Sequence, residues 1–164
     1  MTHVARLTPP DFRAWLLQRG IRRFALAWDE AAQRTTASHP DLDDLAAWLD
    51  SDTTDYDRHE GIFVEVGDSG VFHAAFVHRT CRGQGAGGLR LWPYETVEAM
   101  LRDGLRLARG MTRKNALAGL WWGGGKGVMA RMPDVDVGQP DIRRQVYVEY
   151  GRFIASLQGC YVTA

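Results

Sequence analysis

The chain of 164 residues is 45% hydrophobic and 24% charged, the composition of a single globular domain large enough to bury a core. Twenty basic residues balance twenty acidic ones, and no basic stripe with interleaved aromatic residues argues for nucleic acid as a partner. No run of about 20 apolar residues could span a membrane, and the first ten residues lack the apolar stretch of a secretion signal, so we expect a cytoplasmic protein without a membrane partner.

The first 60 residues predict two short helices and one strand. Thr8 and two prolines precede an apolar segment that ends at Gly20, which is typical of a capped helix terminated by glycine. Residues 21–28 predict a strand, residues 29–40 are polar and weakly patterned, and residues 41–49 predict a second helix. We therefore divide the chain into an N-terminal extension, residues 1–40, and a main domain, residues 41–164.

From residue 62 the hydrophobic pattern changes to that of strands. Residues 62–66 and 71–77 predict a hairpin around a glycine-bounded turn. A glycine-rich segment, residues 83–88, and a short apolar run, residues 89–92, follow. Helical spacing then predicts an amphipathic helix from Val97 to Met111. Its charged side chains are expected to point outward: Glu98, Arg102, Asp103, Arg106 and Arg109.

The last third of the chain begins with a second glycine cluster, residues 123–127, which we interpret as a loop leading into a strand at residues 128–130. Asp141 is expected to cap a final helix, and Gly159 to end it. Residues 161–163 resemble the start of another strand. The alternation of strands and helices predicts an α/β fold with a mostly parallel sheet flanked by helices.

The cysteine and histidine patterns argue against sulfur redox chemistry and against a metal site. Cys81 and Cys160 lie outside any CxxC pattern, so two reduced, packed thiols are expected. The five histidines form no HExxH pair and no zinc-type grouping with cysteine. His73 and His78 differ in parity along one predicted strand and should point to its opposite faces.

Both glycine clusters invite a nucleotide-binding interpretation. Residues 83–88 formally satisfy GxGxxG, but the segment that follows does not open a helix on which a pyrophosphate could sit. In the second cluster Leu120 replaces the first glycine of GxxxxGK, and Gly127 replaces the Ser or Thr that binds magnesium. A glycine-rich turn is favoured at both places.

Two lysines stand out: Lys114, at the C-terminal end of a long helix, and Lys126, in a glycine loop that would let a small ligand approach the backbone closely. A single exposed lysine is usually a solvated surface charge. A lysine in a partly dry pocket near a second cation, however, can lose its proton near neutral pH and act as a base. The pair therefore indicates a candidate site.

The order and spacing of several motifs resemble one family. Residues 87–90 (GGLR), 110–116 (GMTRKNA), 119–127 (GLWWGGGKG), 151–154 (GRFI) and 161–164 (YVTA) are similar to the leucine and phenylalanine dehydrogenases of the Glu/Leu/Phe/Val amino-acid dehydrogenase family. The similarity covers about residues 41–164. It implies a three-layer α/β/α fold with a mostly parallel, mixed sheet, and a domain that binds substrate and pairs subunits.

The resemblance also implies roles for individual residues. Lys114 would bind the substrate α-carboxylate, and Lys126 would be the catalytic lysine that activates water during oxidative deamination to a 2-keto acid. Further substrate-binding residues implied by the family pattern are Gly87, Gly88, Met111, Ala86 and Ala164. From the residues alone, Met111 could equally be core, and the two glycines could serve a turn.

Departures from the family pattern bear on the substrate. Ala86 stands where leucine enzymes carry a larger aliphatic residue, so a wider pocket is expected. No lysine occurs between Arg82 and Arg90, where glutamate enzymes bind the distal carboxylate. Trp121 and Trp122 are atypical, and Gly127 replaces a threonine. We expect a preference for apolar or aromatic amino acids.

The family's NAD or NADP binds to a separate doubly wound domain, so no bound cofactor is expected on this chain. The family's acidic pair, whose aspartate assists the catalytic lysine, would follow Ala164. We favour one domain of a two-domain enzyme, inactive alone, that forms a homodimer or larger homo-oligomer. The alternatives are a stand-alone dimerising or amino-acid-sensing module and a purely structural domain.

Overall fold

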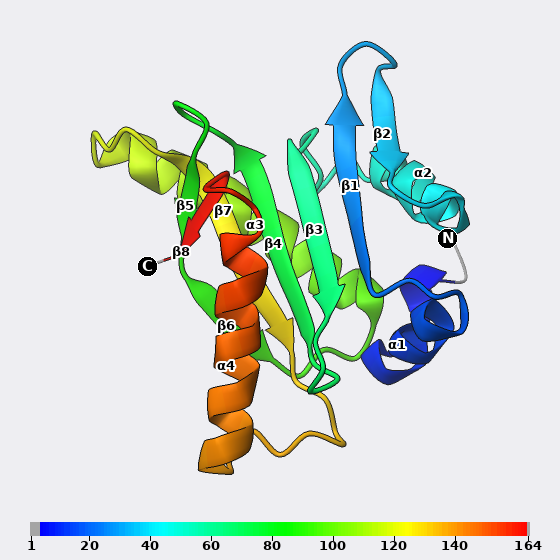
Figure 1. The fold of residues 1–164 in the computed structure, drawn as a ribbon. Coiled ribbons are helices and arrows are strands. Elements are labelled where there is room, and N and C mark those ends of the chain that lie inside the picture. Colours follow the sequence, from blue (N-terminus) through cyan, green and yellow to red (C-terminus); the bar gives the residue numbers. More distant parts are fainter. Residues whose placement is uncertain (1–3, 164) are drawn as a thin grey trace.

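The computed structural model describes residues 4–163, which fold around one sheet with helices on both faces (Figure 1). In chain order the elements are η1 (Val4–Arg6), α1 (Pro9–Gln18), β1 (Arg23–Asp29), β2 (Arg34–Ala37), η2 (Pro40–Leu42), α2 (Asp43–Ser51), β3 (Gly61–Val66), β4 (Phe72–Arg79), β5 (Gly85–Gly87), β6 (Leu89–Trp92), α3 (Val97–Leu117), β7 (Gly123–Ala130), α4 (Pro140–Ala155) and β8 (Tyr161–Thr163).

Within the described residues the strands run in the order β2-β1-β3-β4-β7-β5-β8, and β6 also pairs with β7. Strands β2, β1, β3, β4 and β7 are successively antiparallel. Strands β5 and β6 share the other edge of β7, both parallel to it, and β8 is parallel to β5. The α/β class, the mixed sheet and the predicted hairpin, now β3–β4, are confirmed. The proportion of parallel strand pairs is smaller than expected, because short connections such as those between β1 and β2 and between β3 and β4 make neighbouring strands antiparallel.

The helices form two layers that can be assigned from the alternation of side chains along β4. Phe72 stacks on Phe12 of α1 with ring centroids 5.5 Å apart, whereas His73 points to the other face, where its Nε2 lies 3.4 Å from Glu149 of α4. His78 returns to the first face and contacts Thr112 of α3 at 2.8 Å. The opposite orientation of the two histidines is confirmed, and α1 and α3 lie across the sheet from α4.

The N-terminal residues continue the same sheet rather than forming a separate unit. β1 pairs with β3, so α1, β1 and β2 belong to the layers built by the rest of the chain. β2 is a strand that the sequence interpretation missed. Its residues, Arg-Thr-Thr-Ala, lie at the edge of the sheet and are mostly half-buried or exposed, so they carry no apolar alternation.

The local sequence pattern predicted the ends of α1 correctly but not those of α4. Thr8 caps α1 by accepting a 3.3 Å hydrogen bond from Asp11 N–H, and Gly20 follows the helix with φ of 71°, as predicted. In α4 the predicted cap was wrong: the N-cap is Gln139, and Asp141 lies inside the first turn because Pro140 already occupies the first helical position. That helix ends at Ala155, before Gly159.

Both cysteines are free, but Cys81 is exposed, so it is not the packed thiol that we expected. It lies in the turn before β5, where its backbone exchanges hydrogen bonds with Gln84. Cys160 is half-buried.

Helix α3 lies against β4 and β7 at positions where one surface lacks a side chain. A Cβ on Gly104 would come within 2.5 Å of the ring of Phe76, which is fully buried in β4. Gly110, on the same helix, has no heavy atom within 4 Å of the position of a Cβ.

The two glycines should therefore respond oppositely to alanine. Gly110→Ala should raise the free energy of unfolding by up to about 1 kcal/mol, because alanine favours the helix. Gly104→Ala should instead lower it by about 1–3 kcal/mol, because overpacking against Phe76 outweighs the same helical gain. Urea denaturation of both variants measures the difference, and stabilisation by Gly104→Ala would contradict the packing described.

Candidate functional site

The chain contains eighteen arginines and two lysines, and the two lysines are Lys114 and Lys126. Arginine therefore supplies the remaining basic side chains. An ammonium differs from a guanidinium in that it can lose its proton at accessible pH when it is partly buried. The scarcity of lysine relative to arginine can be read from the sequence, and it supports the choice of Lys114 and Lys126 as candidate functional residues.

Lys126 lies in β7, which includes the whole second glycine cluster, so the predicted loop was wrong. Local propensity favours a loop because glycine is a poor strand former, but strands on both sides hold this segment extended. Lys126 pairs with Phe76 of β4, whose ring faces α3, so the lysine side chain projects from the same face. The register of β6 with β7 places Gly88 beside Lys126 on the other edge.

Glycines before and after Lys126 let neighbouring elements approach the strand. A Cβ on Gly124 would collide with the backbone N of Thr112 in α3. On the opposite face, a Cβ on Gly125 would lie 2.5 Å from the ring of Tyr161, and one on Gly127 would meet the hydroxyl of Tyr150. Lys126 is thus the side chain that this half of β7 directs toward α3.

The electrostatic surroundings of Lys126 favour its neutral form. Burial lowers the pKa of Lys126, and the positive charges of Arg90 and Lys114 lower it further, while Asp103 opposes them. Lys126 is half-buried, whereas Lys114 is exposed in the last turn of α3. The effect of Lys114 on Lys126 indicates that the two amines lie in one electrostatic environment.

Of the other predicted substrate residues, Ala86 and Gly87 lie in β5, beside β7, and Met111 lies in α3. A Cβ on Gly87 would lie 3.1 Å from Cγ of Met111, and Met111 precedes Lys114 by three residues on the same face of α3. Ala86 is buried and pairs with Gly124 of β7. Ala164 lies outside the described residues.

Two buried side chains hold this arrangement together, and the sequence interpretation gave neither a role. Asn115 Nδ2 donates to the carbonyl oxygens of Gly123 at 2.6 Å and Ala86 at 3.3 Å, which joins α3 to β7 and β5. The Tyr161 hydroxyl donates to the carbonyl oxygen of Gly87 at 2.8 Å. Asn115 could have been recognised as the polar residue seven positions after Ala108, on the buried face of α3.

Asp103 was predicted to point outward, but it is buried, and four hydrogen bonds satisfy its carboxylate. Its partners are Arg90, Tyr94 and Arg106. Helical periodicity alone misplaced Asp103, because a buried carboxylate depends on donors from β6 and the following loop.

A histidine cluster fixes the segment before β3 to α3. The ring of His78 bridges Asp57 Oδ2, at 3.0 Å, and Thr112 Oγ1, at 2.8 Å. His59 is fully buried beside it, with ring centroids 4.8 Å apart, and its Nε2 lies 3.0 Å from the carbonyl oxygen of Leu105. Burial lowers the pKa of His59 to about 3.

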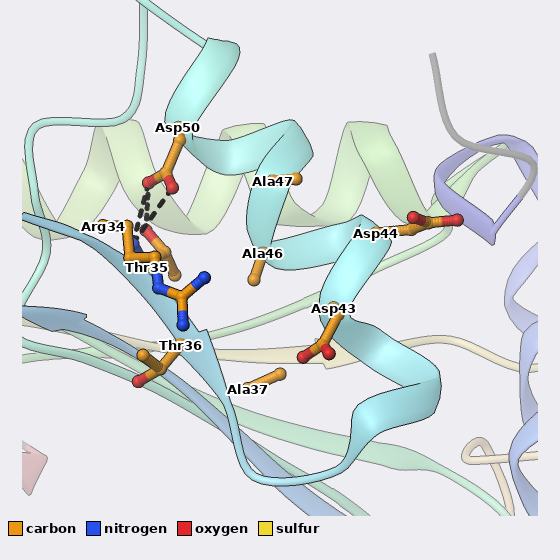
Figure 2. A pocket seen from close by; sticks show the side chains of 9 residues that line it. All are labelled: Arg34, Thr35, Thr36, Ala37, Asp43, Asp44, Ala46, Ala47 and Asp50. Carbon is orange, nitrogen blue, oxygen red and sulfur yellow. Dashed lines mark hydrogen bonds between the residues drawn. The ribbon is translucent and has the colours of Figure 1, made fainter. Parts of the chain in front are cut away.

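A cleft between edge strand β2 and helix α2 lies away from the lysines (Figure 2). Asp50 accepts hydrogen bonds there from the N–H and the hydroxyl of Thr35, and Arg34 extends beside them. β2 ends the sheet on the side opposite β5 and β8. This cleft therefore does not contribute to the lysine site.

The first glycine segment does not fit a dinucleotide. Gly85–Gly87 forms strand β5 and is followed by strand β6, so no helix N-terminus faces the glycines. Across residues 4–163 no group of three or more His, Cys, Asp or Glu side chains is arranged to hold a metal ion. None of the helices in that range is long and apolar enough to cross a membrane.

A family model described as the Glu/Leu/Phe/Val dehydrogenase dimerisation domain matches residues 61–162. Leucine dehydrogenase of Bacillus subtilis is 42% identical over 109 residues, which cover 66% of this chain and 29% of the relative. Valine dehydrogenase of Streptomyces virginiae is 44% identical over 96 residues, which cover 58% of this chain and 25% of the relative.

The crystal structure of L-tryptophan dehydrogenase from Nostoc punctiforme is similar with a TM-score of 0.55 and 37% identity, covering 64% of this chain and 30% of that one. The chain thus spans less than a third of the length of each of these proteins.

The buried histidines should make stability depend on pH. Because His59 binds a proton in the unfolded chain near pH 6.5 but in the folded chain only near pH 3, stability is complete above pH 6.5 and declines as the pH falls. His59→Gln keeps a donor for Leu105 but does not titrate. In this variant the free energy of unfolding should decline less steeply between pH 7 and 5, by up to about 1.4 kcal/mol per pH unit.

Urea denaturation at several pH values measures that slope for both proteins. Some slope should remain in the variant, because burial also lowers the pKa values of His73 and His78. An unchanged slope in His59→Gln would show that His59 is not held neutral.

Proposed function

The chain belongs to the Glu/Leu/Phe/Val dehydrogenase family, through its dimerisation domain, and from this we propose that it is the substrate-binding and subunit-pairing domain of an amino-acid dehydrogenase. The complete enzyme would convert an L-amino acid reversibly to its 2-keto acid, and this domain alone would be inactive. The observation that carries the proposal is the electrostatic effect of one of the chain's two lysines, Lys114, exposed on α3, on the other, Lys126, half-buried in β7.

We assign the α-carboxylate of the substrate to Lys114. Its exposed ammonium stands at the end of α3, where it can reach a carboxylate from solvent. Lys126 is assigned the proton-transfer role. A lysine with a lowered pKa offers a neutral amine that can accept a proton from the water adding to the substrate α-carbon.

Gly87, Gly88 and Met111 are proposed to form the wall next to these amines. Gly88 has no side chain beside Lys126, which leaves room for a ligand at that edge of β7. Ala86 and Ala164 complete the proposed set of substrate-binding residues. A small residue at Ala86 is compatible with a bulky substrate side chain.

We propose an apolar or aromatic amino acid as the substrate. Neither lysine lies in the segment between Arg82 and Arg90, so that segment offers no ammonium to a distal carboxylate. Relatives that act on leucine, valine and tryptophan, by their names, support this class.

The hydride acceptor of the proposed reaction would be NAD or NADP, bound by residues other than those described here. The glycine segment of β5 is not suited to hold it, as its strand-to-strand connection indicates. The proposed location is the cytoplasm, and the proposed partner is a second copy of the chain, in a homodimer or larger homo-oligomer.

The role of Lys114 can be tested with the keto acid of leucine, 4-methyl-2-oxopentanoate. Saturation-transfer NMR detects the weak binding expected of a partial site. Lys114→Ala should remove most of the signal, because the carboxylate loses its counter-ion. Arg113→Ala removes a neighbouring exposed cation and should leave the signal unchanged. Equal signals in wild type and Lys114→Ala would refute the carboxylate role.

Subunit pairing can be measured independently of substrate. Sedimentation equilibrium of the chain at micromolar concentration should give a mass at least twice that of one chain. A single-chain mass up to about 100 µM would contradict pairing through this domain, because stable dimers of domains this size have tighter dissociation constants.

A further inference from the structure

Asp103 forms the centre of a buried ionic cluster on α3, next to the lysine site. Its carboxylate accepts two hydrogen bonds from Arg90 Nη1, at 2.9 and 3.1 Å, one from the Tyr94 hydroxyl at 2.7 Å, and one from Arg106 Nη2 at 2.9 Å. Only 10% of the Asp103 side chain is exposed. A carboxylate with this many donors is fixed in position, because any rotation would leave a buried polar atom unpaired.

Arg90 binds this carboxylate from β6, the strand next to the one that carries Lys126. In the register of β6 with β7, Arg90 pairs with Val128, two residues after Lys126 and therefore on the same face of the sheet. The guanidinium reaches from that face to Asp103 on α3. Arg90 is thus held on the face of the sheet from which Lys126 projects, while Arg106, which is 65% exposed, binds the same carboxylate from the solvent side.

The charged groups around Lys126 come from two elements. Arg90, which acts electrostatically on Lys126, lies in β6, and Asp103 and Lys114, which also do so, lie in α3. From β4 it meets the apolar ring of Phe76, and the next side chain on that face, His78, is engaged with Asp57 and Thr112. The pKa of Lys126 is lowered by Arg90 and raised by Asp103, in agreement with this arrangement.

Resting on the proposed role of Lys126 in proton transfer, we infer that Arg90 and Asp103 are a positioning pair that sets the charge state of the Lys126 amine. Arg90 favours the neutral amine by placing a fixed cation beside it. Asp103 binds Arg90 and offsets part of its effect on the amine with a negative charge. The two residues oppose each other, although they form one ion pair.

Competitive labelling of the full chain with trace acetic anhydride tests this inference without substrate or cofactor. Only the neutral amine reacts, so the labelling rate below the pKa follows the neutral fraction. The two lysines can be separated by chymotryptic cleavage after Trp121 or Trp122 and quantified by mass spectrometry, with Lys114 as an internal reference. At pH 8, Arg90→Gln should slow labelling of Lys126 and Asp103→Asn should accelerate it, each by about twofold or more.

Matched variants separate charge from structure. Arg106→Gln removes another cation from the same carboxylate and should change the Lys126 rate less than Arg90→Gln does. Arg90→Lys keeps the charge and should stay close to wild type, and this pair of Arg90 variants decides the question if Asp103→Asn does not fold. Loosening of the fold would move Lys126 toward an ordinary amine in every variant.

Three results would overturn the inference. They are changes of the labelling rate in the same direction for Arg90→Gln and Asp103→Asn, no change in either variant, or equal effects of Arg90→Lys and Arg90→Gln. Such results would leave the substrate role of Lys114 untouched, since binding of the keto acid is measured separately. Failure of keto-acid binding alongside the expected labelling pattern would instead reject the proposed function and leave the charge coupling in place.

Discussion

The close approach of α3 to the centre of the sheet is the constraint on which the remaining structure depends. The helix and the strands meet where one of them lacks a side chain: Gly104 lies against Phe76, and Gly124 lies against the backbone of Thr112. At this distance the polar groups of the contact must be paired internally, and Asn115 does so with two carbonyl oxygens. The same approach holds Met111 next to Gly87 of β5.

Much of the fold followed from local patterns, because the α1 cap, the β3–β4 hairpin and the apolar face of α3 each depend on residues close together in sequence. The predictions that were wrong share one cause. The glycines around Lys126 are extended because β4 and β5 pair with them, and edge strand β2 carries polar residues because little packs on it. Asp103 is buried because Arg90 and Tyr94 provide donors. Each result depends on tertiary partners that a single segment does not reveal.

The two lysines of the candidate site could be predicted from the sequence, but the residues that hold the surrounding elements in place could not. Lys126 could be selected from its neighbouring glycines, and both lysines from the resemblance to a family; in the structure the charge of Lys114 lowers the pKa of Lys126. Their substrate roles stay predictions. The residues that support the site are Asn115, Tyr161 and Asp103. Asn115 and Tyr161 form hydrogen bonds with residues 8 to 74 positions away in the sequence, and Asp103 forms an ion pair. Contacts between residues so far apart in sequence have no local sequence pattern.

The glycines of β7 also limit how such a site could change during evolution. A side chain at position 124, 125 or 127 would meet α3, Tyr161 or Tyr150, so mutation can explore very little along the strand that carries Lys126. On the proposed assignment, divergence in substrate preference would enter through residues that already carry a side chain, such as Ala86 on β5 or Met111 on α3. A strand that admits almost no variation would thus keep the proposed chemistry unchanged, while its neighbours could alter the substrate that the proposed site accepts.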